Sequence, residues 1–480
     1  MIIKLPHHLT IDRKTTLGKI QKLGFDKTKV DVTVTTYEFR RITGFVLTDG
    51  NGNTVLLSPN RNWSAKDNFE KVIYARPFPA IPDDINKSVL EWIKHPALSS
   101  INDITPEIVA SPVSSWKDVF SFKKENLQDH IEGLRSPQIG AVHAALSHWQ
   151  VTNETATIVM PTGTGKTETM LSLLITGNCN KLLVVVPSDA LRTQVSDKFI
   201  SLGLLKQLGI IKDTAEYPIV CTLNKKPQSV EEVREIFQNC NVVVTTMSIA
   251  GQIPAALQTE IASLCTHLFI DEAHHIAADT WSKFKKAFRE KYVLQFTATP
   301  FRNDAKPIKD KIIFNYPLHK AQEEGYFKPI DFISIYEWDS SQYDRAIAER
   351  AIEKLREDLA NGYDHILMAR VNSKERANAV FQIYNTHPDL NPVQIHTGIN
   401  DKDVRAVRKK ILNKECRVIV CVNMLGEGFD LPELKIAAFH DIKKSLPVTL
   451  QLAGRFTRTN RDNNLGNASI IVNLANIEAT

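Results

Sequence analysis

The chain has 480 residues, of which 43% are hydrophobic and 24% are charged. At about 150 residues per domain this length predicts roughly three folded units, and the composition excludes collagen-like and disordered chains. The 59 basic and 54 acidic residues leave a net charge of only +5, so the overall field does not identify a nucleic-acid-binding protein. A site for a polyanion must therefore be indicated by local motifs.

No apolar run of the sequence reaches the length of about 18 residues that a membrane span needs. The start, MIIKLPHHLT, does not have the apolar core of a signal peptide. The six cysteines form no CxxC pair, and we expect core residues rather than metal ligands. These observations predict a cytoplasmic protein in a reducing compartment, without a membrane segment and without a zinc or iron–sulfur site.

Residues 1–115 are expected to form a small β-rich module followed by a connector. Strands are predicted at residues 30–37, 44–48 and 54–58, and the turn DGNGN joins the last two as a hairpin because Asp, Gly and Asn tolerate positive φ. From residue 80 onward Pro and Ser interrupt the pattern, and one helix is predicted at residues 85–94.

Beyond Trp116 apolar runs of strand length alternate with segments of helical period, first up to about residue 300 and then again from about residue 366. Strands that are apolar throughout and separated by helices predict a parallel sheet covered on both faces. We therefore expect two consecutive α/β domains that meet between residues 305 and 330. The predicted strands are 157–160, 182–186, 241–245, 268–270, 293–296, 366–368, 393–396, 417–422, 436–439 and 469–472, and the helices of the second domain include 373–384 and 401–412.

The segment PTGTGKTETM, directly after Met160, follows a predicted strand and opens a predicted helix. Gly163 and Gly165 let the backbone curl around phosphate oxygens, and the N–H groups at the helix start favour negative charge. Lys166 would reach the β- and γ-phosphates, and the hydroxyl of Thr167 would ligate Mg²⁺. Met160 replaces the usual first glycine of this loop, and a glycine-rich turn without a ligand is the alternative interpretation.

A partner acidic motif, LFIDEAHH, ends a later apolar strand at residues 268–275. Asp271 would hold Mg²⁺, usually through water, and Glu272 would take a proton from the attacking water. An acidic pair after a strand, seen alone, more often begins a solvated helix. Together with the phosphate loop upstream, the pair indicates an ATP-hydrolysing site that requires Mg²⁺.

From about residue 130 to about residue 475 the sequence resembles the superfamily 2 DEAD/DEAH-box helicases, with motifs in the order of that family. TATPFRND and NMLGEGFDLP are most similar to the branch of the type III restriction-enzyme motor subunits, the ResIII type. Leu452 and Thr457 depart from the QRxGRxGR form of the spliceosomal-type DEAH RNA helicases. The matching motifs are LRSPQIGA (134–141), VVVPSDALRTQ (184–194), VVVTTMSIAGQ (242–252), FTATPFRND (296–304), ILMARVNSKERA (366–377), QIHTGI (394–399), NMLGEGFDLP (423–432) and QLAGRFTR (451–458).

The resemblance implies an α/β fold with two tandem RecA-like parallel-sheet domains preceded by the β-rich module. The expected domains are residues 1–115 for the module and connector, 116–320 for the ATP-binding domain and 321–480 for the helicase C-terminal domain. The implied cofactors are ATP and Mg²⁺. The residues expected to bind them are Gln138, which would read the adenine, and Gly163, Thr164, Gly165, Lys166, Thr167, Asp271, Gly426 and Asp430.

The second domain is expected to complete the catalytic set, which consists of Lys166, Asp271, Glu272, Gln451, Arg455 and Arg458. Arg455 and Arg458 stand three residues apart on a predicted helix, so they share a face and could both approach the γ-phosphate. An arginine in that position is worth about 10³ to 10⁵ in rate. Seen in isolation, two such arginines would more often pair with surface acids.

Nucleic acid is expected to bind through sugar and phosphate groups, without reading of the base sequence. The first domain would contribute Arg192, Thr245 and Thr246, and the second Thr397 and Gly398. The basic segment 402–410 could add phosphate contacts, but a solvated helix face is the preferred interpretation.

The predicted function is that of an ATP-dependent helicase or translocase, with DNA preferred over RNA on family likeness alone. Two alternatives stay open: an RNA helicase, and a nucleic-acid-sensing ATPase subunit of a restriction or antiviral defence assembly that does not separate strands. A catalytically dead scaffold is opposed by the intact Lys166, Glu272, Arg455 and Arg458. Few residues follow Arg458 in the sequence, so we expect a nuclease or other effector activity to come from a separate partner.

Overall fold

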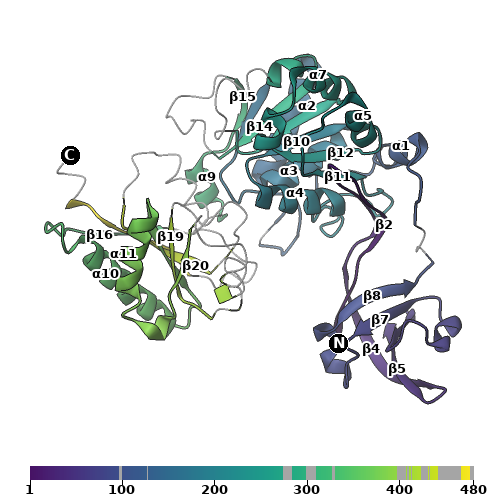
Figure 1. Ribbon diagram of the computed structural model, residues 1–480, viewed down its shortest axis with the longest axis horizontal. Helices are drawn as coiled ribbons and strands as arrows, with labels where there is room; N and C mark the ends of the chain where they lie inside the picture. Colours follow the sequence, from purple (N-terminus) through teal and green to yellow (C-terminus); the bar gives the residue numbers. More distant parts are fainter. Residues whose placement is uncertain are drawn as a thin grey trace. The chain divides into compact units, whose positions relative to one another are not determined.

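The computed structural model places most of the chain in three β-sheets with flanking helices (Figure 1). The described residues are 1–96, 100–126, 128–273, 284–298, 310–326, 330–396, 407, 410–411, 413, 415–422, 431, 433–441 and 466–475. Within these ranges, helices of the length and apolarity needed to cross a membrane are absent.

The first sheet has six strands and belongs to the N-terminal module. Neighbouring strands are antiparallel except β6 and β7, which are parallel. The predicted hairpin at DGNGN is confirmed, because Thr48 pairs with Thr54 and Gly52 has φ +83°. In sheet order the strands are β1 (Ile2–Leu5), β4 (Thr28–Phe39), β5 (Ile42–Asp49), β6 (Thr54–Ser58), β7 (Val72–Arg76) and β8 (Val89–Lys94).

The helix predicted at residues 85–94 is wrong. A short 3-10 turn, η2 (Pro82–Lys87), precedes β8 (Val89–Lys94), which pairs antiparallel with β7. Leu90 and Trp92, two positions apart, both pack against the core of the module. This two-residue period is that of a strand, and the Pro- and Ser-rich composition concealed it.

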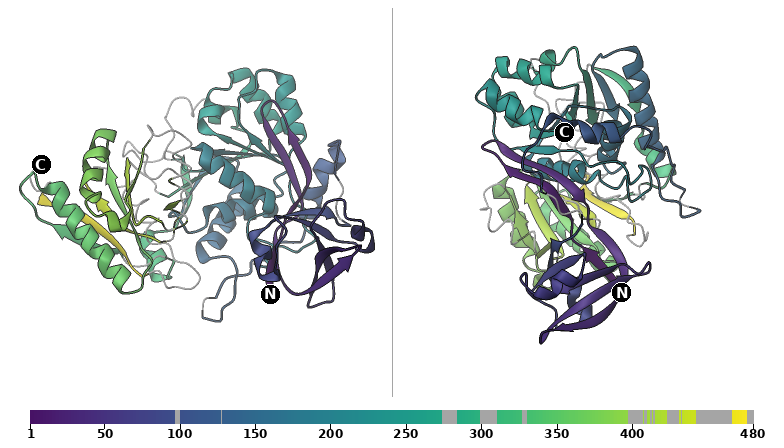
Figure 2. Two further views of the ribbon diagram at one scale, coloured as in Figure 1. Left: turned by 60° about the horizontal axis from the view of Figure 1, so that its bottom comes forward. Right: turned by 90° about the vertical axis from the view of Figure 1, so that its right-hand side faces the viewer.

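The hairpin of β2 (His8–Lys14) and β3 (Gly18–Phe25) leaves the six-stranded sheet and extends the sheet of the next domain. Strand β3 pairs antiparallel with β11 (Val220–Leu223), and Figure 2 shows the purple hairpin along the teal strands. Gly18 permits this close approach, because a Cβ there would lie 2.1 Å from the carbonyl oxygen of Thr222. The sequence analysis did not anticipate this pairing.

The second sheet has nine strands in the order β15-β9-β14-β13-β10-β12-β11-β3-β2. Its predicted apolar strands are confirmed within a residue or two, and those from β9 to β14 are almost entirely buried. The remaining strands are β9 (Ala156–Val159), β10 (Leu182–Val186), β12 (Val242–Thr246), β13 (His267–Ile270), β14 (Tyr292–Thr297) and β15 (Lys311–Asn315). The helices of this region are α1 (Pro106–Ser115), α2 (Ser136–Val151), α3 (Lys166–Thr176), α4 (Asp189–Ser201), α5 (Val230–Gln238), α6 (Met247–Gly251), α7 (Ala255–Leu264) and α9 (Leu318–Glu323).

The third sheet is parallel throughout and has the order β16-β21-β20-β17-β19-β18. Helices α10 (Tyr343–Ala360) and α11 (Lys374–Tyr384) pack against one face (Figure 1). Its strands are β16 (Ile330–Ile335), β17 (Ile366–Val371), β18 (Val393–Ile395), β19 (Val418–Val422), β20 (Leu434–Phe439) and β21 (Ala468–Asn473). The predicted strands and the helix at 373–384 are confirmed here, and most of the predicted helix 401–412 lies outside the described residues.

Candidate active site

A glycine-containing loop connects β9 to α3 at the carboxyl end of the nine-stranded sheet. Gly163 has φ +93° and Gly165 has φ +95°, values that L side chains rarely adopt. A Cβ on Gly165 would lie 1.9 Å from Nε2 of Gln138. The hydroxyl of Thr164 is buried and donates to the carbonyl of Pro161 at 2.7 Å. The loop therefore has the curled, closely packed form that presents the first N–H groups of α3 to an anion.

Met160, where such loops usually have their first glycine, belongs to the core instead. Its side chain is fully buried, and its sulfur accepts a hydrogen bond from Oγ1 of Thr169 on α3 at 3.8 Å. Its backbone N–H donates to the carbonyl of Thr297 at the end of β14. The departure from the usual pattern is thus accommodated by packing at the end of β9, and the curl of the loop begins after it.

The two motifs expected to cooperate at the site meet directly. Nζ of Lys166, at the start of α3, lies 2.7 Å from Oε1 of Glu272, which follows β13 by two residues. Their side chains are only 9% and 12% exposed. An ion pair that is largely removed from water is strongly coupled, so a change of one partner is felt by the other.

The backbone beside this pair is strained. Glu272 has φ +49°, in the left-handed region that non-glycine residues rarely adopt. The preceding residue, Asp271, donates its N–H to the carbonyl of Val185 at 2.8 Å and accepts the N–H of Glu272 on its Oδ1 at 3.0 Å. Residues held in this region cost of order 1–3 kcal/mol and cluster at functional sites. Here the strained turn aims the carboxylate of Glu272 at the phosphate loop.

Gln138 lies against the phosphate loop, at the start of α2. Its Oε1 accepts the N–H of Arg135 at 2.7 Å and its Nε2 donates to the carbonyl of Gly165 at 3.4 Å. Both ends of the amide therefore bind the protein itself in this structure. Its expected role in reading adenine stays a prediction.

Arg135 is a site residue that the sequence analysis missed. Its Nη1 donates to the carbonyl of Gly163 at 2.8 Å, and its guanidinium lies 5.2 Å from the centre of the Tyr326 ring. Burial, with the charge of Glu125, raises the pKa of Tyr326 to about 12, so its hydroxyl stays neutral. The sequence signal was Pro137 followed by Gln138, which marks a helix start whose capping residue is Arg135.

The residues of the first domain predicted to bind nucleic acid lie near the ends of β10 and β12, but they are not freely presented. The side chain of Arg192 on α4 is 11% exposed and its Nη1 lies 2.8 Å from Oδ1 of Asp189. Thr245 and Thr246 are buried, and their hydroxyls contact the carbonyl of Leu223 and the N–H of Ile249. Contact with phosphate through these groups stays a prediction, and it would require them to exchange their present partners.

Several predicted residues lie outside the described part of the chain. They are the catalytic Gln451, Arg455 and Arg458, the nucleotide-binding Gly426 and Asp430, and the nucleic-acid-binding Thr397 and Gly398. Their roles stay predictions.

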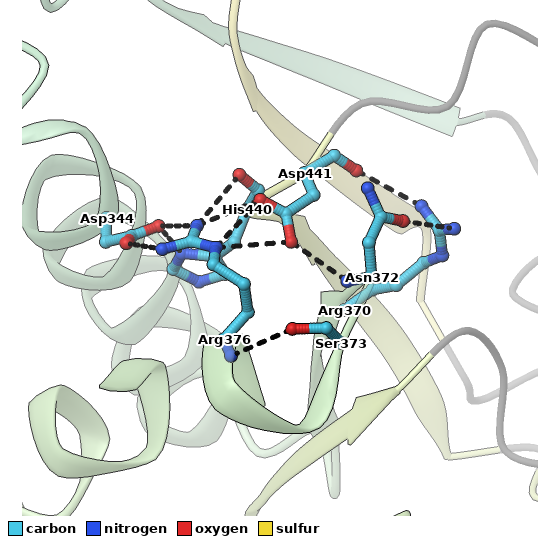
Figure 3. A network of polar contacts seen from close by, with 7 residues as sticks. All are labelled: Asp344, Arg370, Asn372, Ser373, Arg376, His440 and Asp441. Carbon is cyan, nitrogen blue, oxygen red and sulfur yellow. Dashed lines mark hydrogen bonds and ion pairs between the residues drawn. The ribbon is translucent and has the colours of Figure 1, made fainter. Parts of the chain in front are cut away.

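A polar network marks the carboxyl edge of the third sheet (Figure 3). Arg376 on α11 binds Asp344 of α10 through two nitrogens at 2.6 and 2.8 Å, and its Nε binds Asp441 at 3.0 Å. Asp441 also accepts the backbone N–H of Asn372 at 2.9 Å. The buried guanidinium of Arg370 donates to the carbonyl of Asp441 and to Oδ1 of Asn372. The network thus ties the loop after β17 to the chain that leaves β20 toward residues 451–458.

Replacement of Arg376 should destabilise this region. Arg376→Met would leave two partly buried carboxylates without their shared cation, which costs about 1–3 kcal/mol. The hydrogen-exchange protection of α10 and α11 should fall by a corresponding factor at neutral pH. Arg345→Met on α10 is the control, because its ion pair with Glu349 is exposed to solvent and contributes little.

The loss caused by Arg376→Met should depend on pH. Burial alone would raise the pKa of Asp344, but the hydrogen bonds from His440 and Arg376 outweigh burial and hold that pKa well below its ordinary value. The contribution of this carboxylate is therefore complete above the unfolded-state pKa of about 3.9 and is lost as the pH falls through the lower folded value. The difference in protection between wild type and variant should shrink progressively as the pH falls below about 4, and a constant difference would contradict the assigned role of Asp344.

Two family models match the chain. Residues 131–302 match "Type III restriction enzyme, res subunit", and residues 350–460 match "Helicase conserved C-terminal domain". The chain is 24% identical over 393 residues to "DNA 3'-5' translocase XPB2" of Sulfurisphaera tokodaii, which covers 69% of this chain and 80% of that protein.

Two solved structures are similar to this chain. The DUF1998 helicase MrfA bound to DNA has a TM-score of 0.51 and 17% identity, with 77% of this chain and 49% of that chain covered. The Mycobacterium smegmatis helicase Lhr bound to ssDNA and AMP-PNP has a TM-score of 0.48 and 15% identity, with 71% and 47% covered. The chain spans about half the length of these two proteins. The phosphate loop lies within the first match, and strands β17 to β20 lie within the second. The chain therefore carries the ATP-binding and C-terminal domain pair of the superfamily 2 helicases of the ResIII type, a pair of domains that hydrolyses ATP.

Proposed function

We propose that this protein is a cytoplasmic ATP-driven motor that moves along DNA, as a translocase or helicase. The observation that carries the proposal is the contact of Lys166 with Glu272, which places a phosphate-binding cation and a candidate general base at one point of the loop. The likeness to a protein named as a DNA 3'-5' translocase supports DNA as the substrate. Contacts of the motor with phosphate groups would hold the DNA without a preference for its base sequence.

The residues around the loop suit a nucleoside triphosphate with Mg²⁺. Gly165 has φ +95°, which a residue with a side chain would adopt only with strain, and this curled backbone at the start of α3 is the form of a phosphate cradle. Thr167 is partly exposed at the start of α3, and Asp271 directly follows β13, so a hydroxyl and a carboxylate would hold the ion. Both are hard oxygen ligands of the kind that Mg²⁺ prefers. When bound, Mg²⁺ neutralises charge on the β- and γ-phosphates.

Hydrolysis in this site needs one proton transfer by the chain. Water attacks the γ-phosphorus, the bond from that phosphorus to the bridging oxygen of ADP breaks, and Glu272 accepts the proton that the water loses. Lys166 must leave Glu272 to bind the phosphates. Binding of ATP therefore releases the carboxylate as a base at the moment when its substrate is present.

The second RecA-like domain would supply Gln451, Arg455 and Arg458 to the γ-phosphate. An arginine there stabilises charge that develops in the transition state. Because the arginines bind strongly only while the γ-phosphate is present, hydrolysis would alternate two arrangements of the domains. That alternation is the proposed source of movement, and Arg192, Thr245, Thr246, Thr397 and Gly398 would hold the strand.

A partner subunit is a further part of the proposal. The match to the res subunit of type III restriction enzymes supports a place in a restriction or defence assembly with a nuclease or other effector. Recovery of a stable complex with such a subunit from the native cell would support membership of such an assembly. Recovery of a monomer with no associated protein would contradict it.

The substrate is tested by ATPase activity measured in parallel without nucleic acid and with single-stranded DNA, duplex DNA and RNA. The proposal predicts stimulation by DNA well above that by RNA. Stronger stimulation by RNA would show an RNA helicase instead. Equal activity in all four conditions would contradict a nucleic-acid motor.

A further inference from the structure

The hairpin of β4 and β5 ends in an unusual turn. Phe39 pairs with Ile42, so Arg40 and Arg41 alone form the connection. Their φ angles are +53° and +64°. Two positive φ angles define the tight turn that fits the twist of a hairpin, and that turn strongly favours Asn-Gly. Arginine at both positions is strained, because its Cβ crowds the backbone in this region.

The strands below the turn are held firmly. Nε1 of Trp63 donates to the carbonyl of Phe39 at 3.2 Å, directly before the two arginines. The Trp63 ring occupies the place where a Cβ on Gly44 would lie, with its nearest carbon at 2.6 Å from that position. Tyr37 adds edge contacts to the rings of Trp63 and Phe69. The turn therefore sits on a rigid base and cannot relax its strain by moving its strands.

Both arginines are exposed, and neither makes an ion pair within the part of the chain that the structure describes. Arg40 lies over the ring of Phe39 at 5.3 Å, which fixes its guanidinium while leaving N–H donors for a ligand. A pair of guanidinium groups on a rigid support is suited to phosphate oxygens. The backbone strain at this exposed turn indicates that the two arginines serve a function such as binding, because they do not stabilise the fold.

The surroundings favour a duplex over a single strand. Proteins that bind single strands combine a basic groove with exposed aromatic rings on which bases stack. Here Trp63, Tyr37 and Phe69 pack against each other and against the core of the module. Trp63 is buried and the other two rings are partly buried, so the turn presents its two charges beside no fully exposed ring for stacking. Such a surface recognises the regular phosphate backbone of a double helix.

We propose that the Arg40–Arg41 turn is a contact site for the phosphate backbone of duplex DNA, separate from the RecA-like domains. The inference rests on the proposed action on DNA and adds a second point of attachment to it. Because the contact is with phosphates, it should show no base preference and should weaken steeply with salt.

The test replaces the pair in the full-length protein by Arg40→Asn with Arg41→Gly, the residues that the turn prefers. Two opposite effects are expected. Hydrogen-exchange protection of the β4–β5 hairpin should rise, because the strain is relieved. Affinity for a fluorescent random-sequence duplex should fall roughly tenfold at 0.1 M salt, and the slope of log affinity against log salt should flatten by about 1.8, at about 0.9 for each lost phosphate contact.

Two further variants complete the test. Arg40→Lys with Arg41→Lys keeps both charges and should keep duplex affinity within a few-fold. Lys27→Ser with Lys29→Ser removes the same charge from the exposed opposite end of β4 and should leave affinity near wild type. ATPase activity without DNA should be unchanged in all variants.

The outcomes separate this inference from the proposed function. If the Asn-Gly variant gains protection but binds duplex with wild-type affinity and salt slope, while DNA still stimulates the wild type, the inference is overturned and the motor stands. If the variant instead loses binding to polyglutamate but not to duplex, the turn contacts an acidic protein and the inference is also overturned. If no DNA binds or stimulates the wild type, the proposed function itself fails.

Discussion

Glu272→Gln is expected to bind ATP more tightly than the wild type while hydrolysing it at least about a hundredfold more slowly. Loss of a general base costs about 10² to 10⁴ in rate. The neutral amide also weakens the 2.7 Å contact with Lys166, so the lysine is available to the phosphates and the Kd for ATP should fall, roughly threefold to tenfold. Single-turnover hydrolysis and equilibrium binding of ATP measure the two effects separately.

Glu235→Gln is the matched control, because it makes the same change at an exposed position of α5. It should leave both quantities within about twofold of the wild type, as surface changes of this kind usually do. Near-normal hydrolysis in Glu272→Gln would contradict the assignment of the base. Weaker rather than tighter ATP binding would contradict the inference that Glu272 competes with the phosphates of ATP for Lys166.

Arg458→Ala should retain much of its affinity for ATP, held by the phosphate loop, while losing turnover by at least about a hundredfold, on the scale of an arginine that reaches the transition state. It should also lose stimulation by DNA, because a strand held by both domains can promote hydrolysis only by bringing this arginine to the γ-phosphate. The measurement is kcat with and without saturating DNA.

Arg345→Ala is the control for this variant, since Arg345 is an exposed arginine of α10 outside QLAGRFTR. Its turnover should stay near that of the wild type. Persistence of wild-type stimulation in Arg458→Ala would show that the arginine has a structural role only, and the two-domain switch would be wrong.

The buried strands were the most predictable part of the fold. β10 (Leu182–Val186) is apolar throughout and β21 (Ala468–Asn473) is mostly apolar, so local composition was enough to indicate a parallel sheet between helices. The pairing of β3 with β11 was not predictable in this way. It joins residues about 200 positions apart, and a half-polar strand has the same pattern whichever sheet it enters.

The candidate site also has residues that the sequence predicts and residues that it does not. Lys166 and Glu272 were identified because phosphate chemistry requires those residue types after two strands of one sheet, and the structure brings their side chains together. Arg135 was missed, since its contact with Gly163 depends on how the start of α2 packs against the loop. The burial of Thr245 and Thr246 likewise follows from neighbouring elements rather than from their own motif.

The central claim is that ATP hydrolysis moves this protein along DNA, and displacement of a third strand from a DNA triplex tests it most directly, because it requires movement but no separation of the duplex. The wild type should release the third strand in proportion to ATP hydrolysed. Lys166→Ala, which loses the cation that binds the β- and γ-phosphates, should release none. DNA-stimulated hydrolysis by the wild type without any release would contradict the account and would leave a DNA-sensing ATPase in its place.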